Sequence, residues 1–248
     1  EIYTLSLHDA LPISTSLLED TTILSQFILM PQLIMPISMV IITYNLQDSL
    51  RDLHMDARYG IVMFVIGALY AFVTSGMLNS IAISLDRENY NFIKTLPVDM
   101  YKYLMYKFWF FYWIQNLLPV VTLTALLLWL DMPVSLIFAA IFSLLLTSLG
   151  ICHVYFKRDY RLLDLGWQNI MQLANRGGGN ITRMFTWFGA LLAGSGLAAL
   201  AYYVSKAMSK ENAMISTVCL AVVMILFSWS HHRSCTRFWK REFRSGKR

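Results

Sequence analysis

Charged residues are scarce in this chain, and cysteines are few. Asp, Glu, Lys and Arg together make up 14% of the 248 residues, whereas soluble domains carry about 25%. With 57% hydrophobic residues, the chain has too little polar surface to cover itself in water, which excludes a soluble protein. No C-x-x-C pair occurs, which excludes a zinc site and a disulfide framework. The cysteines are Cys152, Cys219 and Cys235.

The chain contains long runs of apolar residues. Six stretches have the length of about 20 residues that crosses the roughly 30 Å of bilayer hydrocarbon, and none contains Asp, Glu, Lys or Arg. Since a charge in hydrocarbon costs at least ~2.5 kcal/mol, this exclusion indicates spanning helices. The sequence therefore predicts an all-α, polytopic membrane protein with six transmembrane helices. They are expected at 23–44, 60–84, 108–130, 133–155, 184–204 and 213–230.

Lys and Arg are divided unequally between the connections, sixteen on one side and four on the other. The rich segments are 85–107, 156–183 and 231–248, and the poor ones are 45–59, 131–132 and 205–212. Positive residues stay in the cytoplasm, so both ends of the chain are predicted to be cytoplasmic. The net charge of +5 thus reflects topology. The basic tail directly follows a span, which favours an anchor on acidic lipid over a nucleic-acid site.

The first thirteen residues, EIYTLSLHDALPI, resemble nothing else in the chain. They can be encoded, codon by codon, by the adapter oligonucleotide that is ligated to DNA fragments for short-read sequencing. Segments of this kind are set aside before a fold is inferred. We therefore expect residues 1–14 to be a sequencing artefact and the chain to be a fragment. One six-span membrane domain is expected over 15–230, followed by a basic cytoplasmic tail over 231–248.

The segment that joins the second and third stretches, Leu85–Phe108, is too long for a simple turn. Apolar residues recur at helical spacing over 87–95, which predicts a short amphipathic helix. Pro97 disfavours helical backbone at the residue before it, and Asp99 is a suitable N-cap for the next helix. We expect a short cytoplasmic helix, a break, and a second helix that enters the membrane.

This segment resembles the cytoplasmic loop between the second and third spans of type-2 ABC (ATP-binding cassette) exporter permeases. That loop carries an acidic residue followed by Arg-Glu, a short helix, a turn such as Leu-Pro-Val, and then a basic residue. The matching residues here are Asp86-Arg87-Glu88, Leu96-Pro97-Val98 and Lys107. The chain departs from the family pattern at Asn89-Tyr90-Asn91, where many members have Gly-Thr, and at Asp99, which replaces a small hydroxyl residue. These departures leave the substrate open.

The resemblance implies a membrane subunit that does no chemistry itself. It implies a multi-pass protein of the bacterial plasma membrane, paired as a homodimer or with a second permease half. The expected cargo is amphipathic or apolar, such as a lipid or peptide. The segment 86–97 is expected to be the coupling helix that sits in a cleft on a separate cytoplasmic ATPase, which binds ATP and Mg²⁺. In that role Tyr90, Phe92, Ile93 and Leu96 are apolar knobs, Arg87, Glu88 and Lys94 line the rim, and Asp86 and Pro97 complete the motif.

Three alternatives stay open on the sequence alone, and one of them is a non-catalytic membrane assembly factor. The helix at 87–95 can instead lie on the bilayer surface, where nearby lysines meet anionic lipid. A protein of another class, an integral membrane enzyme acting on lipid head groups, needs a polar cluster at the interface. Its candidate site is Asp48, Asp52, Asp56 and His54. Arginines interleaved with these carboxylates favour a solvated helix with i, i+4 ion pairs.

Three further patterns receive structural interpretations. The glycines of NRGGGNITR, 175–183, are not followed by the Lys-Ser or Lys-Thr of a phosphate loop, so a flexible turn is expected there. His231 and His232 are adjacent and point apart on a helix, and His153 is expected to be a satisfied interfacial residue. The small residues of 189–196 offer a smooth face for close helix packing, within the chain or between copies.

Overall fold

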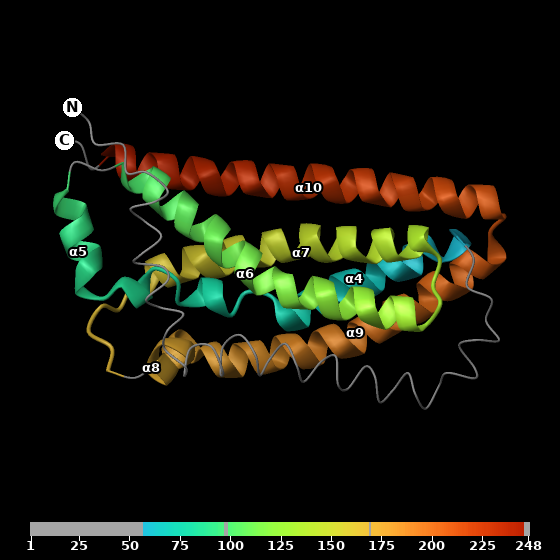
Figure 1. Cartoon of the computed structure of the whole chain (residues 1–248), viewed down its shortest axis with the longest axis horizontal. Helices are drawn as coiled ribbons and strands as arrows, with labels where there is room; N and C mark the ends of the chain where they lie inside the picture. The colour runs from blue at the N-terminus through green and yellow to red at the C-terminus, as the bar shows by residue number, and fades with distance from the viewer. Residues whose placement is uncertain (1–56, 97–98, 169, 246–248) are drawn as a thin grey trace.

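The computed structural model describes residues 57–96, 99–168 and 170–245, which form helices joined by turns, without a strand among them (Figure 1). The long helices are α6 (Met100–Trp129), α7 (Val134–Arg161), α9 (Gly179–Ala207) and α10 (Lys210–Ser245). The shorter α4 (Gly60–Thr74) packs against α7 and α9, and α5 (Glu88–Thr95) lies across one end of the bundle. The remaining elements are η2 (Ala57–Tyr59), η3 (Leu78–Ser80), η4 (Ser84–Asp86), α8 (Ile170–Asn175) and η5 (Arg176–Gly178).

Three of the described helices are long and apolar enough to cross a membrane: α6, α7 and, within α10, Lys210–Phe243. Their outer faces carry large apolar side chains such as Leu117, Phe138 and Phe227, which are 69%, 69% and 67% exposed. Apolar surface of this extent suits lipid rather than water. The prediction of a helical membrane protein is confirmed for the described residues. The first predicted span, 23–44, lies outside them.

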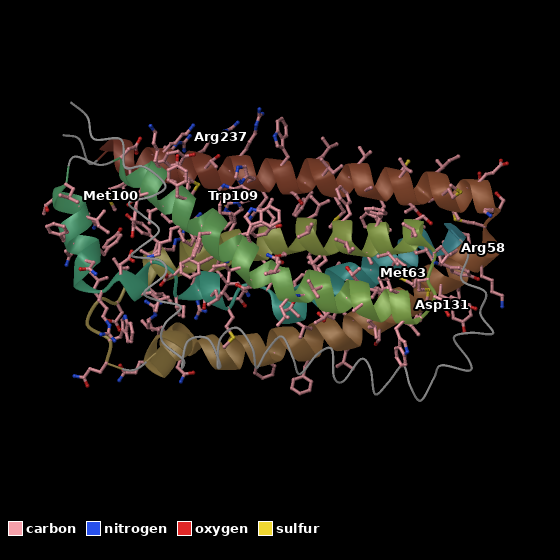
Figure 2. The ribbon with its side chains drawn as sticks, viewed as in Figure 1. Arg58, Met63, Met100, Trp109, Asp131 and Arg237 are labelled. Carbon is pink, nitrogen blue, oxygen red and sulfur yellow. The ribbon has the colours of Figure 1, made fainter. Side chains whose placement is uncertain are left out.

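The two ends of the bundle differ in charge. Figure 2 shows Arg58 and Asp131 at one end and Met100 at the other. α5, the loop 162–168 and the last turns of α10 share the Met100 end (Figure 1). The described parts of the segments rich in Lys and Arg therefore gather at that end.

The second predicted span is interrupted, which corrects the expectation of one helix over 60–84. α4 ends at Thr74, and its 15 residues reach about 22 Å at 1.5 Å per residue, which is short of a full bilayer crossing. Ser75 is extended, and Gly76 has φ +92°, a left-handed conformation that favours glycine. The chain therefore leaves the helix where the hydropathy pattern shows no signal.

Residues 75–86 continue as buried turns and the short helices η3 and η4. Leu78 and Ile81 are fully buried. Gln115 of α6 takes up two of the freed backbone groups: its Oε1 accepts from the Leu78 amide at 3.1 Å, and its Nε2 donates to the Thr74 carbonyl at 3.0 Å. Irregular backbone at membrane depth is tolerated where protein buries and satisfies it.

The segment predicted as a cytoplasmic tail begins as a continuation of α10. That helix runs without interruption to Ser245. Trp239 is 1% exposed and packs edge-to-face on Phe156 of α7, with ring centroids 5.5 Å apart. The interpretation of this segment as a lipid anchor is therefore revised for the inner face of the helix, which belongs to the protein core.

Two glycines determine how closely α4 approaches its neighbours. A Cβ at Gly67 would collide with the backbone carbonyl of Ala140 in α7, and a Cβ at Gly194 would collide with Leu69 of α4. Of the two roles weighed for the small residues of α9, Gly194 has the intramolecular one. Gly189 faces open space instead.

Candidate functional site

The short helix α5 forms as the sequence predicts. It spans Glu88–Thr95, and Leu96 is extended (φ −76°, ψ 150°), as expected for the residue before a proline. The Asp99 carboxylate caps α6 by accepting from the amides of Tyr101 at 3.0 Å and Lys102 at 3.4 Å. α5 is thus a separate helix set across the end of the bundle (Figure 1).

The outward surface of α5 is smaller than predicted. Tyr90 and Ile93 are 0% and 4% exposed and belong to the protein core, so the expectation that they project as knobs is wrong. Phe92 is 64% exposed and Leu96 36%. Lys94 is also exposed, and its ammonium lies 4.5 Å from the centre of the Tyr90 ring. We call the surface made by Phe92, Lys94 and Leu96 the outer face of α5.

Tyr90 fixes α5 to the bundle through its ring. Burial raises the pKa of its hydroxyl, and the nearby Tyr160, Asp86 and Asp159 raise it further, so the group stays protonated. The hydroxyl has no hydrogen-bond partner among the described residues. A buried unpaired polar atom costs about 1–3 kcal/mol, so the ring, and not the hydroxyl, holds α5 in place.

The acidic residue that opens the family motif pairs with the basic residue that closes it. Asp86 accepts from the Lys107 ammonium through Oδ1 and from the Tyr103 hydroxyl through Oδ2, the latter at 2.9 Å. The carboxylate side chain is fully buried and the lysine side chain 3% exposed. Asp86 directly precedes the loop that carries α5, and Lys107 lies in α6 beyond it. The ion pair therefore joins the start of this loop to α6. It also places Asp86 inside the protein, not on the predicted coupling surface.

Arg87 lies at the surface beside α5, next to a polar cavity. Its φ is +48°, and its guanidinium carbon stands 3.7 Å from the centre of the Trp167 ring. Trp167 is itself held by a 2.8 Å hydrogen bond from Nε1 to the Ser84 carbonyl. The cavity has a volume of about 470 Å³ and is lined by Asp86, Arg87, Asn89, Leu165, Gly166 and Trp167. The Glu88 side chain and Pro97 lie outside the described residues.

A second buried ion pair, which sequence reasoning missed, attaches residues 75–86 to α7. Asp159 accepts from the amides of Ile83 and Ser84 at 2.5 and 3.2 Å, and from the Ser84 hydroxyl at 2.7 Å. The Arg176 guanidinium lies 2.6 Å from the same carboxylate. Asp159 is the one acidic residue of the basic run KRDYR, and no local pattern names its partners.

Arg176 also corrects the expectation of a flexible turn at 175–183. Besides Asp159, its guanidinium donates to the Leu162 carbonyl at 2.5 Å and to the Ser84 hydroxyl at 2.8 Å. Gly177 follows with φ +55°, which allows the chain to turn into α9. The glycines thus serve a tight turn that Arg176 fixes to the bundle.

Two of the histidines meet between α7 and α10. His153 Nε2 and His232 Nδ1 are 2.8 Å apart, whereas His153 Nδ1 has no partner within the described part of the chain. His153 is therefore only half satisfied, contrary to expectation. Over the described ranges, no three His, Cys, Asp or Glu side chains are placed to hold a metal ion. The alternative enzyme site, at Asp48, Asp52, Asp56 and His54, lies outside those ranges.

No protein-family model, no characterised protein and no solved structure matches this chain. The resemblance to ABC permeases therefore rests on the motif residues alone. In the structure, the outer face of α5 combines the exposed apolar side chains of Phe92 and Leu96 with the charged Lys94.

Proposed function

We propose that this chain is the membrane subunit of a type-2 ABC transporter in the bacterial plasma membrane. It would span the membrane six times, with both ends in the cytoplasm, and export an amphipathic or apolar substrate such as a lipid or peptide. A separate ATPase subunit would bind ATP and Mg²⁺, because the chain has no G-x-x-x-x-G-K-[ST] sequence. A second copy or a second permease half would complete the transporter.

The observation that carries this proposal is the way α5 is mounted. Its inner face is buried through Tyr90 and Ile93, and the Asp86–Lys107 pair closes its base. Its outer face leaves Phe92 64% exposed at the end of the bundle. A large exposed aromatic side chain on a fixed helix is typical of an anchor that fills a pocket on a partner protein.

The attachment of α5 to its neighbours also suggests how a movement of α5 would reach the membrane helices. α5 is joined on one side to the interrupted segment 75–86, which continues from α4, and on the other to α6. Packed and hydrogen-bonded elements shift as units. A partner that pushes the outer face of α5 would therefore displace α4 relative to α6, which supports ATP-driven opening of a path through the bundle.

Photo-crosslinking tests the proposal. A benzoylphenylalanine replaces Phe92 in the full chain, expressed in cells of the source organism, and a matched control carries it at Met208, which is 36% exposed at the opposite end of the bundle. The position-92 product should contain a protein with a G-x-x-x-x-G-K-[ST] sequence, and the position-208 product should not. Phe92→Asp should reduce ATPase association by more than about tenfold, the loss of a typical interface anchor, whereas Met208→Asp should leave it unchanged.

The stability of each variant separates loss of binding from loss of fold. Phe92 is exposed, so Phe92→Asp should keep the thermal midpoint of the parent chain. If position 92 yields no nucleotide-binding protein, or if Phe92→Asp and Met208→Asp retain the ATPase equally, α5 is not a coupling helix and the proposed function is wrong.

A further inference from the structure

An open apolar groove lies between α4, α7 and α10, away from the outer face of α5. Its volume is about 670 Å³. Most of its lining is carbon, contributed by residues such as Phe72, Gly150 and Phe227. Arg158 lines one extremity of the groove, whereas the hydroxyl residues Thr147 and Ser228 line the other. The groove is thus amphipathic along its length.

The groove has the length of one bilayer leaflet. Its lining on α7 runs from Leu146 to Arg158, twelve residue steps that span about 18 Å. One leaflet contributes about 15 Å of the roughly 30 Å of hydrocarbon. Arg158 lies near the basic end of the bundle, where α7 gives way to the loop 162–168. The charged extremity is therefore at head-group depth and the apolar remainder at acyl-chain depth.

The volume of the groove suits a lipid chain. Pockets of roughly 300–1,000 Å³ are the usual size for small-molecule ligands. A single flexible acyl chain can follow the groove along α7 and α10.

The charge at the extremity favours an anionic head group. Arg158 donates from Nη2 to the carbonyls of Arg176 and Gly177, at 2.6 and 3.3 Å. A guanidinium carries five N–H donors, and no carboxylate lies within ion-pair distance of Arg158 among the described residues. Arg158 thus lines the groove with a positive charge that no described carboxylate neutralises. Arginine in this state is suited to a phosphate.

We propose that this groove binds one anionic phospholipid of the leaflet at the α5 end, with an acyl chain along Gly150 and Phe227 and the phosphate at Arg158. The site depends on the chain lying in a membrane and is independent of ATPase coupling. Arg158 supplies the head-group selectivity and the groove supplies the affinity for the acyl chain. Neutral lipids with the same chains bind more weakly because they leave the guanidinium charge without a net counter-charge.

Native mass spectrometry of the purified full chain tests the site, with phosphatidylglycerol and phosphatidylcholine of identical acyl chains as probes. One phosphatidylglycerol should be retained, about tenfold more tightly than phosphatidylcholine, the size of one charge-assisted hydrogen bond. Gly150→Phe should fill the groove and weaken both lipids, because a Cβ there meets nothing within 4 Å and the ring has room to lie in the groove. Gly196 is equally open, so Gly196→Phe is the matched control and should bind as the parent does.

A second pair of variants separates the charge from the groove. Arg158→Gln should remove the preference for phosphatidylglycerol, whereas Arg161→Gln, one turn further along α7, should keep it. Equal lipid binding by Gly150→Phe and Gly196→Phe, or an unchanged preference in Arg158→Gln, overturns the proposal. A benzoylphenylalanine in place of Phe227 identifies the occupant in membranes: a phospholipid adduct supports the site. An adduct with residues 23–44 or with a second copy of the chain refutes it.

Discussion

Replacing Asp86 with Asn should destabilise the protein strongly, because it leaves the Lys107 ammonium buried without a counter-charge. The carboxylate is fully buried and the lysine side chain only 3% exposed, so water cannot replace the lost partner. Removing one member of a buried ion pair costs about 3–5 kcal/mol. For a chain of this size, 1 kcal/mol shifts Tm by about 2–4 °C, so Tm should fall by about 6–20 °C.

A double variant and a matched control sharpen this expectation. Asp86→Asn combined with Lys107→Met removes both charges, and exchanging a buried pair for uncharged groups is often neutral. The double variant should therefore recover most of the stability that Asp86→Asn loses. Asp99→Asn makes the same chemical change at an exposed N-cap, where Asn caps as well as Asp, and should leave Tm nearly unchanged.

The effect is measured by thermal unfolding in one detergent, followed by tryptophan fluorescence. The five proteins compared are the parent chain, Asp86→Asn, Lys107→Met, the double variant and Asp99→Asn. The difference between the double variant and the sum of the single variants gives the interaction energy of the pair. If Asp86→Asn unfolds at the same temperature as Asp99→Asn, or if the two single losses simply add in the double variant, Asp86 and Lys107 are not a buried pair.

Two further comparisons follow from the contacts. Tyr103→Phe loses a hydrogen bond to the Asp86 carboxylate and should lower the free energy of unfolding by about 1.5–3 kcal/mol. Tyr90→Phe removes an unpaired buried hydroxyl and should keep or raise that free energy. Equal losses of Tm in the two variants contradict these hydrogen-bond assignments. Gly67→Ala places a Cβ against a backbone carbonyl of α7 and should cost about 1–3 kcal/mol, whereas Gly189→Ala meets open space and should not destabilise. Thermal unfolding checks both pairs, and a Gly67→Ala protein as stable as Gly189→Ala refutes the close approach of α4 and α7.

Local signals in the sequence predicted several of the long helices and the boundary between α5 and α6. The apolar runs predicted α6, α7 and α10, because membrane depth imposes one composition over about 20 residues. Pro97 and Asp99 predicted the boundary between α5 and α6, since each acts on the backbone within two or three residues. The expectation of an all-α membrane protein therefore held for the described residues, together with the short helix at its end.

Contacts between distant residues were not predictable in this way. Asp86 and Lys107 are 21 residues apart, and Asp159 and Arg176 are 17 apart, so neither spacing follows a helical or strand period. The interruption at Ser75 depends on Gln115, which satisfies the freed backbone from another helix. The burial of Tyr90 depends likewise on the packing of α5 on the bundle. Hydropathy assigns such a residue to a span or to a surface, but it does not say which distant residue it contacts.

The interrupted segment 75–86 has a consequence for how the protein is made. Its freed amides and carbonyls are satisfied by Gln115, Asp159 and Arg176, and the ribosome adds all three later than the segment itself. Until they arrive, these backbone groups have no protein partner and are too costly to leave in hydrocarbon. The stretch must therefore stay near water or a chaperoning surface while the next helices are synthesised. Its entry into the bundle is thus a late step of assembly, and not part of the insertion of α4.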